Sequence, residues 1–161
     1  MKKRLSHLDA AGAARMVDVS AKSPTLRVAR AHAFVRLSAE ALRGLPENPK
    51  GNPLEAARLA GIAAAKRTWE LIPLCHLLSL THVDVETRVE KDGVRILSSA
   101  SAHAATGVEM EALTAAAVAA LTVYDMLKAL DRAIEIRELY LVEKTGGRSG
   151  VYRRRKPAGK S

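Results

Sequence analysis

The chain has 161 residues, of which 48% are hydrophobic, so its length supports one core but not two ordinary domains. Its net charge of +9 lies mostly at the two ends, and aromatic residues make up only 3% of the chain, so we expect no nucleic-acid partner. We also expect a cytoplasmic protein with no membrane contact, because no apolar run reaches the roughly 20 residues of a membrane span. The single Cys75 excludes an internal disulfide and cannot by itself build a zinc site.

The first part of the chain gives a weak periodic signal. Residues 1–30 are polar, Ala-rich and without a sustained period, which predicts a partly irregular N-terminal segment. Residues 31–37 alternate between two faces, as a half-buried strand does. Ser38 is then expected to act as the N-cap of a short helix over residues 39–45.

Three prolines and a glycine predict a loop over residues 46–53. Helix formation is expected to resume at Pro53, a residue that a first helical turn tolerates, and to continue to about Leu71. Trp69 falls near the apolar stripe of this helix. Gly61 is expected to allow close packing.

The second half of the chain has clearer elements. Residues 81–89 and 94–102 predict two antiparallel strands, because the first alternates cleanly and Lys91-Asp92-Gly93 has the chemistry of a hairpin turn. Residues 106–109 resemble a capping box, and an Ala-rich and Leu-rich helix is expected to follow as far as about Leu130.

A strand over residues 136–143 closes the body, so the predicted order is β-α-β-β-α-β. This pattern is typical of an α+β, ferredoxin-like fold, an antiparallel sheet with two long helices packed on one face. We predict a single α+β catalytic domain over residues 31–150, after the N-terminal segment, and a basic flexible tail over residues 151–161.

Charged residues at both ends of the long helix are candidates for function. Helical spacing puts Glu111 and Asp125 at opposite ends of one largely apolar face, and Lys128 follows Asp125 closely enough for their side chains to meet. A surface ion pair and a first turn that suits the helix dipole would explain these residues without any function.

Further candidates lie in connecting segments. His76 follows Pro73, and its imidazole can take or give a proton near neutral pH, although a structural histidine is the alternative. Cys75 is expected to be a packing residue rather than a nucleophile, because no helix N-terminus or base is placed to lower its pKa. Lys144 precedes a glycine-containing segment, residues 145–150, which suits phosphate binding but is not a P-loop.

Two runs of sequence carry a family resemblance, namely LIPLCH at residues 71–76 and TGVEMEALT at residues 106–114. They resemble the molybdenum cofactor biosynthesis protein C family, the cyclic pyranopterin monophosphate synthases. Further matching runs, in the same order along the chain, are residues 16–22, 64–69, 121–126 and 144–150. The resemblance therefore extends over about residues 5–152.

The resemblance implies a phosphorus-oxygen lyase of molybdenum cofactor (molybdopterin) biosynthesis. It would convert (8S)-3',8-cyclo-7,8-dihydroguanosine 5'-triphosphate to cyclic pyranopterin monophosphate and release pyrophosphate. It also implies a homo-oligomer, a hexamer built as a trimer of dimers, with sites at subunit boundaries. No redox cofactor or protein-bound metal is expected, and a divalent cation that accompanies the triphosphate stays an open alternative.

The resemblance also assigns residues to roles. The implied substrate-binding residues are Leu74, Cys75, His76, Met110, Glu111, Lys50 and Lys66, and the implied catalytic residues are Asp125, Lys128 and Lys144. We predict that Asp125 and Lys128 form an acid–base pair, that Lys144 and Lys50 contact phosphate or share proton transfer, and that His76 and Glu111 orient the pterin-forming part of the substrate. The alternative is a noncatalytic phosphate-ligand-binding protein on the same scaffold, which would need neither Asp125 nor Glu111.

The chain departs from the family pattern at two places. Leu77 stands where a proline usually follows the Leu-Cys-His run, and residues 102–105 lack the basic residue expected before Thr106. We expect His103 or Arg148 to substitute for that missing charge.

Overall fold

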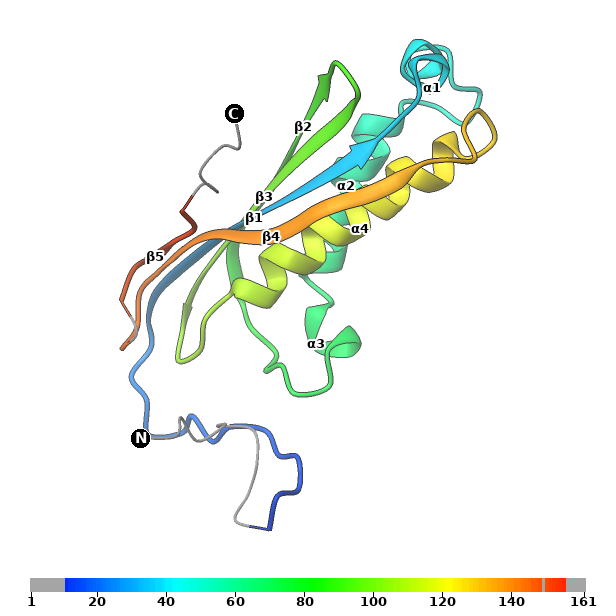
Figure 1. Ribbon diagram of the computed structural model, residues 1–161. Helices are drawn as coiled ribbons and strands as arrows, with labels where there is room; N and C mark the ends of the chain where they lie inside the picture. Colours follow the sequence, from blue (N-terminus) through cyan, green and yellow to red (C-terminus); the bar gives the residue numbers. More distant parts are fainter. Residues whose placement is uncertain (1–10, 149, 156–161) are drawn as a thin grey trace.

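The computed structural model describes residues 11–148 and 150–155. Its elements in chain order are β1 Thr25–Arg36, α1 Ala39–Gly44, α2 Pro53–Ala65, α3 Thr68–Leu71, β2 Leu80–Glu90, β3 Gly93–Ala104, α4 Glu109–Leu127, β4 Glu135–Thr145 and β5 Tyr152–Arg153. The strands form one antiparallel sheet in the order β2-β3-β1-β4-β5, and α2 and α4 pack on one of its faces (Figure 1). This arrangement confirms the predicted ferredoxin-like α+β fold, with β5 added at the edge.

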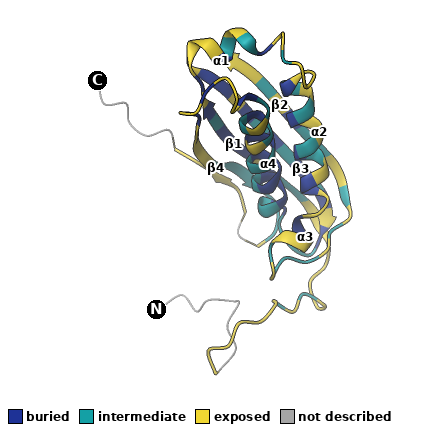
Figure 2. Ribbon diagram, turned by 90° about the vertical axis from the view of Figure 1, so that its right-hand side faces the viewer, coloured by how far each residue is buried: buried dark blue, intermediate teal, exposed yellow. Residues whose placement is uncertain are grey.

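The core between the sheet and α4 is built largely from small residues. The fully buried alanines of this layer include Ala29, Ala31, Ala33, Ala100, Ala102, Ala112, Ala115, Ala116, Ala119 and Ala120. Figure 2 shows α4 lying across the buried face of the strands. Small side chains bring the helix backbone close to the sheet, which keeps packing dense without large aromatic residues.

Gly61 allows the close approach of α2 to α4 that the sequence predicted. A Cβ atom at this position would lie 2.8 Å from the carbonyl oxygen of Ala115 and 3.0 Å from Cγ2 of Val85. The helix pair therefore leaves no room for even a methyl group at Gly61.

Among the described residues, α4 is the one helix long and apolar enough to cross a membrane by length and composition. Its packing accounts for that composition, because it packs beside α2 and against strands β1, β3 and β4, and it buries residues along most of its length. It is the central core helix of this fold.

β1 begins earlier than the periodicity predicted. Thr25–Arg36 is a continuous strand, whereas a strand was expected only from residue 31. Residues 25–30 pair with residues 99–104 of β3, and part of this stretch also pairs with β4. Partners that are distant in sequence thus order a stretch whose own pattern is weak.

The predicted continuous helix from Pro53 to Leu71 is wrong, because α2 ends at Ala65 and α3 is a separate turn. The Oγ1 of Thr68 hydrogen-bonds to the carbonyl oxygen of Ala65 at 3.0 Å, which offers the backbone an alternative to a regular helix. Trp69 consequently lies 43% exposed rather than on a buried stripe.

The two predicted helix caps had different outcomes. Ser38 caps α1 as expected, because its Oγ accepts a hydrogen bond from the backbone N–H of Ala41. The capping box at α4 is wrong, since Val108 is the N-cap residue and no side chain caps this helix. The carboxylate of Glu109 instead forms an ion pair with Lys144.

The predicted tail is partly ordered. Tyr152–Arg153 pairs with β4 as strand β5, and the guanidinium of Arg154 lies 4.2 Å from the centre of the Tyr140 ring. Residues 156–161 of the predicted tail and residues 1–10 of the predicted N-terminal segment lie outside the described residues.

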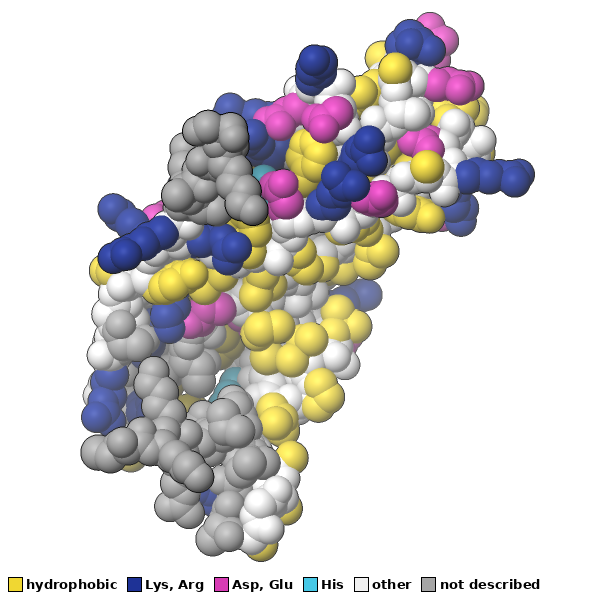
Figure 3. Space-filling model, in the orientation of Figure 1, with side chains coloured by type: hydrophobic (Ala, Val, Ile, Leu, Met, Phe, Trp, Pro, Cys, Tyr) yellow, Lys and Arg dark blue, Asp and Glu magenta, His cyan; other side chains and the backbone are white. Residues whose placement is uncertain are grey.

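Several large apolar side chains are exposed, among them Leu59, Trp69, Leu71, Leu77 and Leu121. Figure 3 shows hydrophobic side chains gathered on the side where α4 lies.

Candidate functional site

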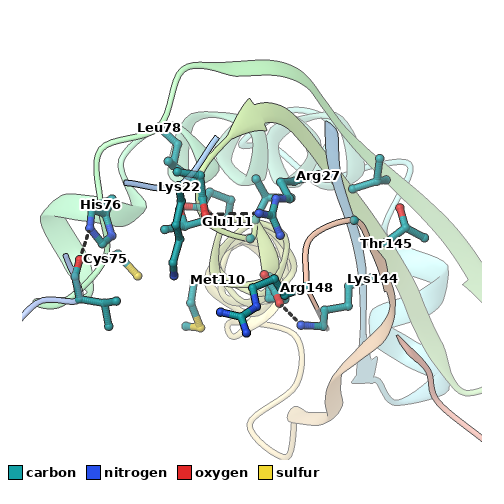
Figure 4. A pocket seen from close by; sticks show the side chains of 18 of the residues that line it. Lys22, Arg27, Cys75, His76, Leu78, Met110, Glu111, Lys144, Thr145 and Arg148 are labelled. Carbon is teal, nitrogen blue, oxygen red and sulfur yellow. Dashed lines mark hydrogen bonds and ion pairs between the residues drawn. The ribbon is translucent and has the colours of Figure 1, made fainter. Parts of the chain in front are cut away.

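A cavity of about 540 Å³ opens at the N-terminal end of α4. Five parts of the chain form its wall, namely residues 17–22, 27–28, 74–78, 105–111 and 144–148, each of which contributes some of the lining side chains (Figure 4). We call it the α4 cavity. It brings together six of the residues predicted from sequence: Leu74, Cys75, His76, Met110, Glu111 and Lys144.

His76 and Cys75 reach the cavity from the segment between α3 and β2. The Nε2 of His76 lies 2.9 Å from the carbonyl oxygen of Val17. Burial, and then the charge of Glu111, raise the pKa of the Cys75 thiol. A thiol held in its protonated form is a poor nucleophile, which agrees with the expected packing role of Cys75.

Glu111 is a buried carboxyl group at the end of the cavity, with 4% of its surface exposed. Burial raises its pKa most, the nearby Glu109 raises it further, and a backbone hydrogen bond opposes both. Ser98 holds this turn of α4 to the sheet, because its hydroxyl donates to the carbonyl oxygen of Ala112 at 2.6 Å. Glu111 therefore has the environment of an acid that holds its proton to higher pH than an ordinary glutamate.

Glu109 and Lys144 form an ion pair across the cavity wall, with 2.8 Å between Lys144 Nζ and Glu109 Oε1. Each side chain is 27% exposed. The Glu109 carboxylate folds over Gly107, where any Cβ atom would overlap it. Within residues 106–109, Gly107 therefore leaves space for the Glu109 carboxylate, and Glu109 does not cap the helix.

Four basic side chains line the cavity among mostly apolar neighbours, namely Lys22, Arg27, Lys144 and Arg148. The Arg27 guanidinium donates to the carbonyl oxygens of Ala104 and Ala105 at 3.2 and 3.3 Å. It lies against Gly147, whose φ is 75°, and a Cβ atom there would overlap the guanidinium. The glycines after Lys144 therefore make space for Arg27.

The position before Thr106, which lacks the basic residue of the family pattern, lies in the wall of the cavity. Ala105 lines the cavity, so the departure from the family pattern falls inside the site. Arg148 also lines the cavity, whereas His103 is exposed on β3 and does not line it. Of the two substitutes predicted from sequence, Arg148 is the one that reaches this cavity.

Asp125, Lys128 and Lys50 form a second group, which we call the acid–base group, at the other end of α4. Lys128 Nζ lies 2.7 Å from Asp125 Oδ1, and Lys50 Nζ lies 3.9 Å from Asp125 Oδ2. The hydrogen bond from Lys128, followed by the charges of Lys128 and Lys50, lowers the pKa of Asp125. The same pairing raises the pKa of Lys128.

The structure corrects one expectation about Asp125. Asp125 was expected on the apolar face of α4, but its side chain is 60% exposed. Glu111 and Asp125 are also far apart, because the intervening turns of helix span about 21 Å at a rise of about 1.5 Å per residue. One chain therefore does not bring its own acid–base group into its own α4 cavity.

Lys50 is held near Asp125 by its loop. The side-chain amide of Asn48 donates to the carbonyl oxygen of Met126 at 2.8 Å, and the Asn48 Oδ1 accepts from the backbone N–H of Lys50 at 2.9 Å. This pair of bonds ties the proline-rich loop to the C-terminal end of α4.

Lys66 belongs to neither group. It is exposed at the end of α2, where it lines a separate cavity of about 370 Å³ together with His82. Within residues 11–148 and 150–155, no three His, Cys, Asp or Glu side chains lie close enough to hold a metal ion.

Sequence reasoning did not assign Lys22, Arg27 or Glu109 to the site. Lys22 ends a run that resembles the family, so that run carried a usable signal. Arg27 had none, because residues 25–30 were expected to be irregular. Glu109 was explained by capping, and its ion pair depends on Lys144, which is distant in sequence.

Known proteins resemble the chain over most of its length. Residues 16–147 match the model of the MoaC family. Proteins named cyclic pyranopterin monophosphate synthase 1 from Mycobacterium bovis and Mycobacterium tuberculosis are each 58% identical over 153 residues, which cover 93% of this chain and 90% of the relative. The cyclic pyranopterin monophosphate synthase of Methylobacterium nodulans is 55% identical over 152 residues, 92% of this chain and 95% of the relative. The chain belongs to the MoaC family.

Proposed function

We propose that the protein is a cyclic pyranopterin monophosphate synthase. It converts (8S)-3',8-cyclo-7,8-dihydroguanosine 5'-triphosphate to cyclic pyranopterin monophosphate with release of pyrophosphate, in molybdenum cofactor biosynthesis. The names of the relatives support this reaction. The observation that carries it is the α4 cavity, which combines a buried carboxyl group, an imidazole and four basic side chains.

The cavity suits a triphosphate substrate. Lys22, Lys144 and Arg148 offer positive charge to the phosphates and to the departing pyrophosphate, whose charge must be neutralised as it leaves. Glu111 and His76 orient the pterin-forming part by hydrogen bonds. The reaction needs no redox cofactor, and the protein acts in the cytoplasm.

The complete site is shared between subunits of a homo-oligomer, a hexamer built as a trimer of dimers. In this arrangement the acid–base group of one chain meets the α4 cavity of another. Support comes from the separation of about 21 Å between Glu111 and Asp125, which follows from about 1.5 Å of rise per residue. Further support comes from the exposed apolar side chains of α2 and α4, Leu59 and Leu121, which a partner would cover.

One assay separates this function from noncatalytic binding. The purified protein is incubated with the cyclic dihydroguanosine triphosphate, and both pyrophosphate and pterin product are measured. We expect the two products in equal amounts. A protein that binds the triphosphate but releases no pyrophosphate would be the phosphate-ligand-binding alternative.

A further inference from the structure

Residues 15–24, here the N-terminal strap, form one wall of the α4 cavity before β1 begins. Its side chains are mostly exposed, and only Val17 and Val19 are half-buried. Val17 and Lys22 line the cavity. The strap therefore contributes to the site while having few apolar contacts of its own to hold it there.

The strap has internal order. Asp18 Oδ1 accepts hydrogen bonds from the backbone N–H and the hydroxyl of Ser20, at 2.9 and 2.7 Å. The backbone N–H of Lys22 donates to the carbonyl oxygen of Val19 at 2.9 Å. These bonds shape the strap into turns, but they do not attach it to the sheet or the helices.

Attachment comes from His76. In the described part of the chain, the hydrogen bond between His76 Nε2 and the Val17 carbonyl oxygen is the one that joins residues 15–24 to the body of the fold. Because a carbonyl oxygen only accepts, the imidazole must donate from Nε2. Nε2 carries this hydrogen both in the corresponding neutral tautomer and in the imidazolium ion, so the bond does not depend on the charge of His76.

Lys22 depends on this attachment. Figure 4 shows its side chain extending between the His76–Cys75 segment and Met110, toward the middle of the cavity. We infer that His76, besides its proposed contact with the pterin-forming part, fastens the strap through Nε2 and Val17, and that the fastened strap presents Lys22 to the phosphate groups of the substrate. The second half of this inference rests on the proposed function, and the first half does not.

Two amide variants of His76 separate fastening from proton transfer. The amide nitrogen of His76→Gln reaches about as far as Nε2 and can donate to Val17, whereas that of His76→Asn is too short. Neither amide carries a proton as imidazole does. Fastening therefore predicts that Gln and Asn differ, and proton transfer predicts that both fail alike.

The first measurement needs no substrate. Trypsin cuts after Arg15 and Lys22, and mass spectrometry follows the two cleavages in the full chain under native conditions. We expect cleavage about fivefold faster in His76→Asn than in wild type, the factor given by loss of one net hydrogen bond, with His76→Gln close to wild type. Equal cleavage rates in all three proteins would overturn the fastening role.

The second measurement is steady-state kinetics on the triphosphate. We expect a higher KM in His76→Asn than in His76→Gln, and a Lys22→Gln change that adds little to the KM of His76→Asn, because the unfastened strap already withholds Lys22. A loss of kcat of about 100-fold or more in both amide variants would instead assign His76 to proton transfer. If KM is equal in the two variants while cleavage differs, the fastening stands and the role of Lys22 is overturned. If wild type gives no turnover at all, the proposed function fails, and the trypsin comparison still decides the fastening.

Discussion

Asp125 is an exposed carboxylate between two lysines, Lys128 and Lys50. Its bond to Lys128 lowers the pKa of Asp125 and raises the pKa of Lys128, so the pair is charged at neutral pH. A surface pair of this kind contributes little to folding. In the proposed shared site, the pair would gain a chemical role once a substrate from another chain's cavity excludes water from it.

Asp125→Asn should therefore abolish turnover with little effect on the fold. We expect kcat to fall by about 100-fold or more, because the amide keeps the size of the side chain but loses its charge and its proton transfer. Steady-state kinetics and the thermal midpoint measure the two effects. Asp84→Asn is the matched control, since Asp84 pairs with Arg58 at 3.7 Å outside both groups and its loss should spare activity. Near-normal turnover by folded Asp125→Asn would remove Asp125 from the mechanism.

Glu111 links the site to stability through its raised pKa. Its folded-state pKa lies above the ordinary 4.5, so the folded protein binds the Glu111 proton more tightly than the unfolded chain does. Stability is then lost as pH rises from the unfolded pKa through the folded pKa, and no further loss follows above it.

Glu111→Gln should cancel this loss, because the amide is neutral at every pH. We expect the free energy of unfolding of the variant, relative to wild type, to be higher at pH 7 than at pH 4. Urea unfolding at the two pH values measures the difference. An identical difference at both pH values would show that burial does not raise the Glu111 pKa. Turnover should fall in the same variant. Lower activity together with higher stability at pH 7 would show that the Glu111 carboxyl group serves the reaction and not the stability of the fold.

At the scale of elements, α4 and its contact with α2 set the geometry of the whole site. The N-terminal end of α4 carries Glu109, Met110 and Glu111 into the cavity, and its C-terminal end carries Asp125. Small residues fix how closely α4 approaches α2 and the sheet. At Gly61 this approach is so close that an added Cβ atom would lie 2.8 Å from the carbonyl oxygen of Ala115.

Gly61→Ala should destabilise the protein although alanine is the better helix former. We expect a loss of about 1–3 kcal/mol from overpacking against Ala115 and Val85. Ala63→Gly, at an exposed position of the same helix, should cost about 0.5–1 kcal/mol through helix propensity alone. Denaturant unfolding of both variants tests whether the protein loses stability in each case, although the two exchanges between glycine and alanine run in opposite directions. A gain in stability from Gly61→Ala would mean that α2 lies farther from α4.

At the scale of the whole molecule, the sequence predicted those elements that depend on residues close to one another in the chain. The β2–β3 hairpin follows from clean alternation around a turn, and the Ser38 cap follows from a short-range bond. The early start of β1 was not predictable, because residues 25–30 are ordered by pairing with residues 99–104 of β3, which are distant in sequence. The α4 cavity has the same limitation, since five separate segments meet there and only those with a family-like run could be assigned.

The separation of the two groups makes the shared site testable by mixing subunits. If one chain's acid–base group completes another chain's α4 cavity, an inactive Asp125→Asn chain and an inactive Lys144→Ala chain together form sites with both residues intact. Random pairing in a two-fold dimer gives about one quarter of such sites. Activity of the mixture should rise toward that fraction of wild type once mass spectrometry shows subunit exchange.

Lys50→Ala provides the matched control for this mixture. Lys50 lies 3.9 Å from Asp125 in the same chain, so both residues reach a shared site from the same subunit. Every site formed between Asp125→Asn and Lys50→Ala chains then contains one defect in its acid–base group, and this mixture should stay inactive. Restoration by Lys144→Ala but not by Lys50→Ala is the pattern that only a shared site produces. Failure of both mixtures after complete exchange would confine the α4 cavity and its catalytic groups to one chain, and would require a large movement along α4 to bring them together.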